Sequence, residues 1–302
     1  MESCIEILLC FDRRFLPGAA VTIRSISENA EPSRPLRFHI VHPDLRPRDR
    51  KTLDASAMDR AAGVRSVYYP LDLAVFDGLL RSRSVSRTAY ARILAGEVLD
   101  AVIHRVVYVD VDVLFLRDVA ELFDLPLGNH VLAAVPNGSL QDQREQIARL
   151  GLASRSYFAS GLMVINLDLW RTSNLGARAL HFAERAGSRL VLHDQDALNA
   201  ILAGEYLQLP LKWCHLPSYG RTQEPVVVHY AMDHKPWHAD YTGDYRDEFF
   251  QHLDRTALAG WRPARWMGLA PHVARLSRMF PYAPTALRLL TERASRIVGR
   301  VH

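Results

Sequence analysis

The feature that most constrains the fold is a regular alternation of short apolar runs with helical patterns between residues 5 and 109. Four apolar runs predict buried strands, at 5–11, 36–41, 64–69 and 105–109. Stretches with helical patterning separate them, at 19–29, 47–61 and 86–99. This alternation predicts an α/β domain with a mainly parallel central sheet.

The predicted sheet also indicates where functional side chains belong. Ligands of such sheets bind beyond the carboxyl ends of the strands, so we expect functional residues directly after Phe11 and Val109. Further along, residues 158–166 are predicted to form another strand that runs into a helix at 167–186. The polar segment 139–156 is expected to cover a site rather than build the core.

Composition excludes several classes of protein. Of the 302 residues, 49% are apolar and 23% charged, which excludes a disordered, collagen-like or coiled-coil chain. Three cysteines without Cys-x-x-Cys spacing provide no disulfide framework and no thiolate zinc site, and indicate a reducing compartment. The first residues are acidic, unlike a signal peptide, and no apolar run approaches the roughly 20 residues of a spanning helix. We therefore expect a protein that is neither exported by that route nor membrane-spanning.

The most informative motif is the carboxylate pair Asp110 and Asp112, which follows the predicted strand 105–109. If the chain stays extended, side chains at i and i+2 lie on the same side, and two such carboxylates can share one divalent cation. A Mg²⁺ or Mn²⁺ ion held there can bridge a diphosphate and neutralise charge on a departing phosphate. The alternative is a pair of loop aspartates that face the solvent.

A haloacid-dehalogenase-type phosphatase also places Asp-x-Asp after a strand, with the first Asp as nucleophile. Such an enzyme needs a later lysine, for which only Lys212 and Lys235 are available, and an acidic pair at the end of another strand. The later pair Asp194 and Asp196 precedes a predicted helix instead. The pattern therefore fits this class poorly.

A second motif spans residues 229–238 and contains three histidines and a lysine. Imidazole is a common ligand of transition metals, so His229 is a candidate to complete a Mn²⁺ site with the two aspartates. Lys235 is a candidate to contact a diphosphate as a point charge. A hydrogen-bonded histidine loop and a separate zinc site remain as alternatives.

The third motif, His-Asp-Gln-Asp-Ala-Leu-Asn at 193–199, begins a predicted helix. Asp194 suits the N-cap of that helix, which is a purely structural role. Asp194 and Gln195 together also suit the binding of sugar hydroxyls. The sequence leaves both interpretations open.

In this order, the segments YVDVDVLFLRD, SYFASGLMVINLDLWR, HDQDALN and VVVHYAMDHKPWH resemble the family 8 glycosyltransferases. They extend from about residue 105 to residue 238, with weaker similarity around Asp12 and at 88–92. Within the family, the similarity is to bacterial lipopolysaccharide galactosyl- and glucosyltransferases. This resemblance implies a GT-A fold, a UDP-hexose donor, Mn²⁺, and transfer with retention of the anomeric configuration.

The resemblance also implies roles for individual residues. Asp110, Asp112 and His229 would ligate the metal, and Lys235 would hold the diphosphate and assist departure of UDP. At the nucleoside end, Asp12 would bind the uracil or ribose, and Arg92 would lie near the donor sugar and phosphate. Asp194 and Gln195 would face the sugar, with Gln195 close to the anomeric carbon.

The chain departs from the family pattern at three places. Ala159 stands where the family usually has Asn before a small residue and Gly, so a sugar-binding amide is missing, for which Ser160 is a partial substitute. Met232 stands where a Gly usually precedes Lys-Pro-Trp, which implies an altered loop. Asp12 is followed by Arg-Arg-Phe instead of Asp-Asn-Tyr. These changes bear on donor identity and nucleotide contacts.

Together with the motifs, the resemblance implies a retaining, Mn²⁺-dependent transferase that moves galactose or glucose from a UDP-sugar to a glycan or glycolipid. A module that binds the UDP-sugar without turnover is the non-enzyme alternative. Glycosyl transfer passes through an oxocarbenium-like state. The metal and Lys235 would stabilise the departing diphosphate, and Gln195 or Asp194 the positive anomeric carbon.

Charge divides the chain into 1–260, the expected catalytic domain, and 261–302, a basic segment. The segment holds eight arginines and one glutamate, so that the net charge of +4 is the sum of −3 and +7. Its apolar residues gather on one side of a helical wheel, which predicts a basic helical tail on an anionic membrane surface. A terminal helix packed on the domain is the alternative. We expect a cytoplasmic protein, peripheral at the inner face of the membrane, with no nucleic-acid partner.

Overall fold

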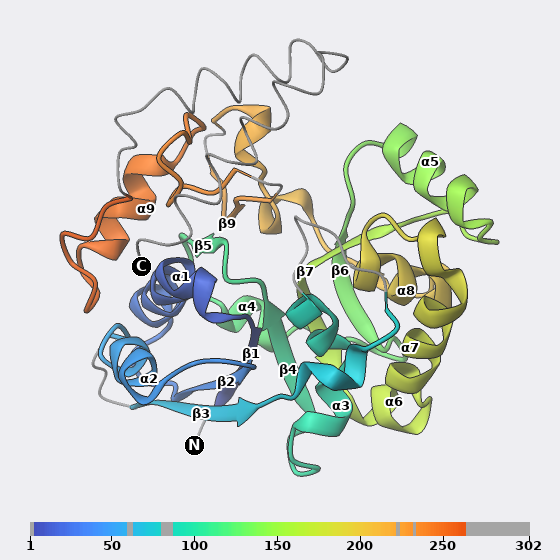
Figure 1. The fold of residues 1–302 in the computed structure, drawn as a ribbon, viewed down its shortest axis with the longest axis horizontal. Helices are drawn as coiled ribbons and strands as arrows, with labels where there is room; N and C mark the ends of the chain where they lie inside the picture. The colour runs from blue at the N-terminus through green and yellow to red at the C-terminus, as the bar shows by residue number, and fades with distance from the viewer. Residues whose placement is uncertain (1–2, 59–62, 80–86, 222–223, 232–233, 264–302) are drawn as a thin grey trace, which may run out of the picture.

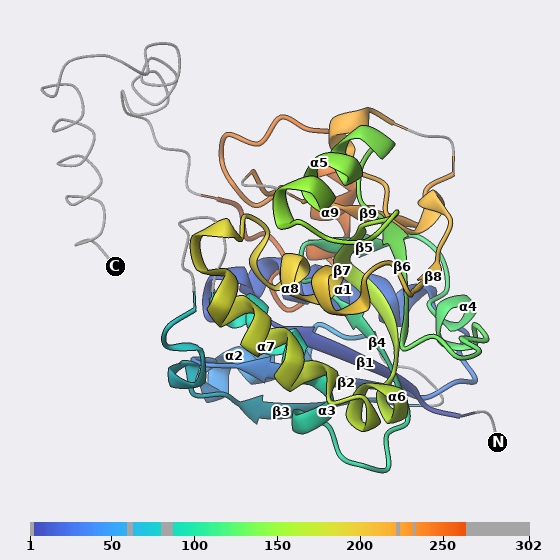
Figure 2. The ribbon, with the colours of Figure 1, turned by 90° about the vertical axis from the view of Figure 1, so that its right-hand side faces the viewer.

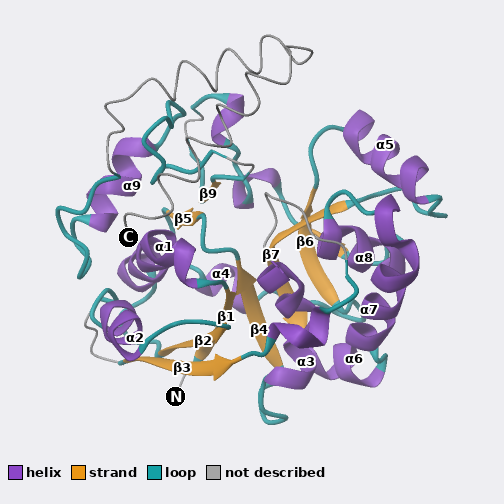
Figure 3. Ribbon diagram, viewed as in Figure 1, coloured by secondary structure: helices purple, strands orange, loops and turns teal. Residues whose placement is uncertain are grey.

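A computed structural model describes residues 3–58, 63–79, 87–221, 224–231 and 234–263. Its centre is a seven-stranded sheet with the order β3-β2-β1-β4-β7-β6-β8, covered by helices on both faces (Figures 1 and 3). The strands of this sheet are β1 (Ile5–Cys10), β2 (Leu36–His42), β3 (Val64–Pro70), β4 (Arg105–Val109), β6 (Leu132–Pro136), β7 (Phe158–Asn166) and β8 (Leu207–Gln208).

The first half of the sheet is parallel throughout. Strands β3, β2, β1 and β4 pair in parallel, with Ile7 of β1 aligned to both Phe38 of β2 and Val107 of β4. Because β1 and β4 are parallel neighbours, the residues after Cys10 and after Val109 emerge at one edge of the sheet. This arrangement confirms the predicted mainly parallel sheet.

The second half of the sheet includes one reversed strand that the sequence analysis did not anticipate. Strand β7 runs antiparallel to both β4 and β6, while β8 is parallel to β6. A separate two-stranded antiparallel sheet pairs β5 (Val113–Phe115) with β9 (Val227–His229). Strand β5 follows β4 after a short turn, so β9 is brought to the carboxyl end of β4.

Each face of the sheet carries its own hydrophobic core, since successive strand residues point to opposite faces. On one face, the β1 residues Ile5, Ile7 and Leu9 pack with α1 (Leu16–Asn29), α2 (Pro47–Asp54) and α4 (Ala120–Phe123). On the other, Leu8 and Cys10 pack with a second set of helices (Figure 2), namely α3 (Ala95–Val98), α6 (Leu167–Thr172), α7 (Leu175–Ala186) and α8 (His193–Leu202).

Three predicted helices have different bounds in the structure. The helix expected at 47–61 ends at Asp54, and the segment 86–99 forms a 3₁₀ helix, Arg87–Leu94, followed by the short α3. The helix expected at 167–186 is two helices, because Asn174 takes a left-handed backbone with φ 51° between α6 and α7. Within the polar segment 139–156, α5 (Leu140–Leu150) begins with a Ser139–Asp142 capping box.

A third, smaller core joins the C-terminal part to the β5–β9 sheet. Phe249 of α9 (Arg246–Leu253) is buried there against Tyr230 and Trp237, with ring centroids 5.9 and 5.6 Å apart. Nearly all of the predicted tail, residues 264–302, lies outside the described residues. Within the described part, no helix combines the length and apolar character that crossing a membrane requires.

Candidate active site

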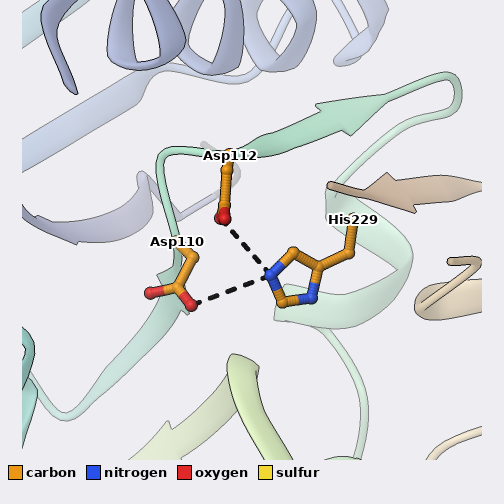
Figure 4. Close-up of side chains that lie close together, drawn as sticks. All are labelled: Asp110, Asp112 and His229. Atoms are coloured by element: carbon orange, nitrogen blue, oxygen red, sulfur yellow. Dashed lines mark ion pairs between the residues drawn. The ribbon is translucent and has the colours of Figure 1, made fainter. Parts of the chain in front are cut away.

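The Asp110–Asp112 motif lies in a turn between β4 and β5. The backbone N–H of Asp110 donates to the carbonyl of Gly161 at 2.8 Å, and the chain then turns at 111–112 before β5 begins. The expectation that the two carboxylates meet because the chain stays extended is therefore wrong. The turn itself brings them together, since it directs both side chains to the same space (Figure 4).

His229, the last residue of β9, lies opposite both carboxylates. Antiparallel pairing aligns it with Val113, the residue directly after Asp112. Its Nε2 is 3.3 Å from Asp112 Oδ1 and 3.8 Å from Asp110 Oδ2 (Figure 4). One ligand atom of each residue lies within 4.8 Å of the others, and among the described residues no other group of His, Cys, Asp or Glu has this arrangement.

In each carboxylate, the oxygen that lies farther from His229 is bound by protein donors. Asp110 Oδ1 accepts from the Tyr108 hydroxyl at 2.5 Å and pairs with Arg92 at 2.9 Å. Asp112 Oδ2 pairs with the Lys235 ammonium, which also donates to the carbonyl of Tyr230 at 2.8 Å. The remaining oxygens face His229. Two carboxylate oxygens and one imidazole nitrogen suit Mn²⁺ or Mg²⁺, so the donor set fits a divalent cation.

Charges around Asp112 favour its ionised form. Burial alone raises the pKa of this carboxyl, but the charges of Lys235 and His229 outweigh burial and hold the pKa well below its usual value. Burial lowers the pKa of His229, but the charge of Asp112 and the hydrogen bond to it outweigh burial, so that the pKa is raised to about 10. In the metal-free protein His229 and Lys235 therefore act as cations between which the Asp112 carboxylate is held.

Asp110, Asp112 and His229 form the candidate metal-binding group, called the metal cluster below. Two contacts of this cluster had not been predicted. Cys214 Sγ lies 3.7 Å from Nδ1 of His229, on the side of the ring away from the carboxylates. Tyr108 supports Asp110, and its position two residues earlier on the strand was an available signal, since i and i+2 share a face. No comparable signal existed for Cys214, which reaches His229 only through the fold.

A second polar group surrounds Arg92, which is buried. Its guanidinium pairs with Asp194 Oδ2 at 3.0 Å and donates to the carbonyl and hydroxyl of Ser160 at 2.9 and 3.0 Å. Gln195 Oε1 accepts the backbone N–H of Ser160 at 3.0 Å. Because Arg92 also pairs with Asp110, it connects the metal cluster to Asp194 and Gln195, so these predicted site residues are brought together.

Asp194 is not the N-cap that one interpretation of the sequence assigned to it. The N-cap of α8 is Leu192, and Asp194 lies inside the first turn, where only 4% of it is exposed. Burial raises the pKa of its carboxyl to about 6, although the charge of Arg92 opposes that rise. A buried carboxylate next to a metal cluster is typical of a functional site.

Asp12 lies directly after Phe11, at the carboxyl end of β1, and is buried. It accepts the backbone N–H of Arg14 at 3.0 Å and forms an ion pair with the Arg14 side chain at 2.8 Å. These contacts fix the first turn after β1 through the N-cap of the 3₁₀ helix Arg13–Phe15.

The other histidines of the second motif lie in a hydrogen-bonded loop. Nδ1 of His238 lies 3.3 Å from the backbone N of Lys235, and His234 lies 3.4 Å from Asp240. The loop alternative is thus correct for these two, while His229 belongs to the metal cluster. The phosphatase alternative requires a lysine at the site. Lys212, one of its two candidates, instead pairs with Glu121 at 2.8 Å on the surface.

Comparisons with known proteins agree with this geometry. The model of the family "Glycosyl transferase family 8" matches residues 6–241. General stress protein A of Bacillus subtilis is 28% identical over 276 residues, covering 84% of this chain and 95% of that protein. The lipopolysaccharide 1,3-galactosyltransferase of Salmonella typhimurium is 28% identical over 244 residues, covering 76% and 71%.

A solved structure shows the same fold. The galactosyltransferase LgtC, in complex with donor and acceptor sugar analogues, superposes with a TM-score of 0.74 at 24% identity, covering 87% of this chain and 99% of LgtC. The fold is the GT-A fold of glycosyltransferases.

Proposed function

Since the chain belongs to glycosyl transferase family 8, we propose that it is a retaining transferase that moves a hexose, galactose or glucose, from a UDP-sugar to a glycan or glycolipid acceptor. The similarity to a lipopolysaccharide galactosyltransferase supports the class of donor and acceptor. The observation that carries the proposal is the convergence of Asp110, Asp112 and His229 beside Lys235.

In this proposal the three convergent residues hold Mn²⁺ or Mg²⁺. A bound divalent cation supplies Lewis-acid stabilisation of the diphosphate leaving group. Lys235, which contacts Asp112, lies at the same cluster and adds a second positive charge for the departing phosphate. Asp12 and Arg92, whose side chains flank the ends of β1 and β4, are assigned to the nucleoside and to the donor phosphate and sugar.

The sugar is assigned to the side of the cluster where Asp194 and Gln195 lie. Both side chains contact Ser160, and Arg92 joins them to Asp110, so a hexose bound there has polar groups against its ring. The carboxylate of Asp194 or the amide oxygen of Gln195 stabilises positive charge at the anomeric carbon. The acceptor hydroxyl attacks from the face of the leaving group, and its proton passes to the departing UDP phosphate oxygen as the bond from the anomeric carbon to UDP breaks.

A panel of UDP-sugars, assayed for hydrolysis with and without Mn²⁺, tests the proposal. We expect turnover of UDP-galactose or UDP-glucose that requires the metal and is lost in Asp112→Asn. The control is Asp168→Asn, which changes a half-exposed aspartate on α6 that pairs with His104. Unchanged turnover in Asp112→Asn contradicts the metal assignment.

The same panel separates the enzyme from a binding-only module. Calorimetric binding of a UDP-sugar with Mn²⁺, without hydrolysis or transfer to any acceptor, would favour the module. The enzyme is supported by the complete set of Asp110, Asp112, His229 and Lys235, which is present and in contact, whereas a decayed module need not retain all four.

We further propose that the enzyme is cytoplasmic and works at the inner face of the membrane, held there by the basic segment 261–302. The support is the charge pattern of that segment alone. Co-sedimentation with anionic liposomes should be lost when residues 264–302 are deleted. A shortened protein that sediments as well as the full chain contradicts this part of the proposal.

A further inference from the structure

Asp196 is the most completely bonded carboxylate near the site. It is fully buried, at 0% exposure, and its Oδ1 accepts from the Tyr157 hydroxyl at 2.6 Å and from Arg149 at 2.7 Å. Its Oδ2 accepts two backbone N–H groups, of Val191 at 2.7 Å and Leu192 at 2.9 Å. Both oxygens are therefore occupied by protein donors, which leaves Asp196 no free oxygen for a substrate.

These bonds lie beside a residue with an unfavourable backbone conformation. The residue after Leu192 is His193, which has a left-handed backbone with φ 45°, and the next two residues are Asp194 and Gln195. Such a conformation persists in a residue other than glycine when the surrounding structure fixes it. Asp196 fixes the backbone of His193 on both sides. Its side chain binds the N–H groups of the two residues before His193, and its own backbone follows Gln195 directly.

The partners of Asp196 come from other elements. Arg149 lies near the end of α5, which Figures 1 and 2 show beside α8, and Tyr157 directly precedes β7. Asn199, one turn further along α8, binds the backbone N–H and carbonyl of Phe158 at 2.8 and 3.0 Å. The first turns of α8 are thus bonded to β7, to Tyr157 before it and to α5 through the side chains of Asp196 and Asn199.

We propose that Asp196 is a positioning residue: with Arg149 and Tyr157, it sets the place of Asp194 and Gln195 at the sugar. This inference rests on the proposed transferase function. Removal of Arg149 leaves a buried carboxylate without its cation, which is unfavourable enough to displace the turn. The metal cluster, which shares no contact with Asp196, stays intact.

Arg149→Met and Tyr157→Phe test this inference, because each removes one donor to Asp196. Matched controls are Arg144→Met, which changes an exposed arginine on the same helix, and Tyr206→Phe, which removes a buried tyrosine hydroxyl that is not a donor to Asp196. We expect kcat for UDP-sugar hydrolysis to fall about ten- to a hundredfold in the two test variants, while the donor KM and the Mn²⁺ affinity change less than about twofold.

Each outcome either supports or overturns the inference. The expected split between kcat and KM, with both controls at the wild-type level, supports the positioning role. Wild-type kcat in both test variants overturns it, and so does a parallel loss of Mn²⁺ affinity, which indicates general unfolding. If the wild-type protein turns over no UDP-sugar, the proposed function fails instead. In that case, faster amide hydrogen exchange at Asp194 and Gln195 in Arg149→Met than in Arg144→Met still supports the inference, and equal exchange overturns it.

Discussion

Gly161 of β7 lies so close to His229 that no side chain fits between them. A Cβ at position 161 would be 2.4 Å from Cε1 of His229 and 2.9 Å from Oδ2 of Asp110, inside the contact distance of both. The carbonyl of the same residue accepts the N–H of Asp110. Gly161 thus shapes the space between two predicted metal ligands, and the need for glycine there is steric.

Gly161→Ala should therefore abolish or strongly weaken Mn²⁺ binding, because the new methyl group pushes His229 away from the carboxylates. Titration followed by electron paramagnetic resonance of free Mn²⁺ measures the effect. Gly96→Ala is the control: its Cβ would meet the ring of Trp170 at 2.8 Å, so it disturbs packing away from the metal cluster. Equal Mn²⁺ affinity in the two variants would show that Gly161 has no special place at the site.

Lys235 is expected to act on the leaving group. Lys235→Met removes the charge that lies against Asp112 and should lower kcat for UDP-sugar hydrolysis by about a hundred- to a thousandfold, the usual effect of losing one transition-state donor. Lys212→Met, which changes a surface lysine paired with Glu121, should retain activity. Steady-state kinetics at saturating Mn²⁺ compare the two, and similar kcat values would exclude the assigned role.

The buried carboxyl of Asp194 should make the metal-free protein less stable as pH rises. Its pKa is raised by burial from 3.8 to about 6 in the folded state, so the folded protein binds the proton more tightly than the unfolded chain. The stabilisation is complete below pH 4 and is lost as pH rises through 6, a change of about 3 kcal/mol from this group.

Asp194→Asn cannot ionise at this position, so its unfolding free energy relative to the wild type should increase between pH 4 and pH 7. Urea denaturation with EDTA at several pH values measures the difference. A difference between the two proteins that is constant over this range would contradict the raised pKa.

Helix α9 lies beyond the family match, which ends at residue 241, yet it supports the loop that carries Lys235. Phe249→Ala removes the buried ring that packs on Trp237 and should cost about 3–5 kcal/mol of stability. It should also lower kcat about tenfold at temperatures where the variant is folded, because the loop shifts.

Phe250→Ala serves as the comparison for Phe249→Ala. Phe250 is half-buried beneath Arg246 and Arg262, so its loss should cost about 1 kcal/mol or less and leave kcat unchanged. Thermal denaturation and initial rates measure both effects. If both variants have wild-type kcat, α9 only stabilises the fold.

Local patterning was sufficient to locate most strands. The predicted strands 105–109 and 158–166 coincide with β4 and β7, because a continuous apolar run records burial on both faces of a sheet. It was less informative for helices: Asn174, with its left-handed backbone, divides the helix expected at 167–186. The reversed direction of β7 had no local signal, since an apolar run has the same pattern in either direction.

The sequence by itself determined the α/β class and the family, and it named Asp110, Asp112, His229 and Lys235 as candidate site residues, because all of these depend on residue types in a fixed order. The tertiary structure decided how they meet. A turn rather than an extended chain joins the carboxylates, and the pairing of β5 with β9 brings His229 to them. It also decided that Asp194 forms an ion pair with Arg92 and does not act as the N-cap of α8. Contacts of this kind join residues that are distant in the chain, and only the packed fold brings them together.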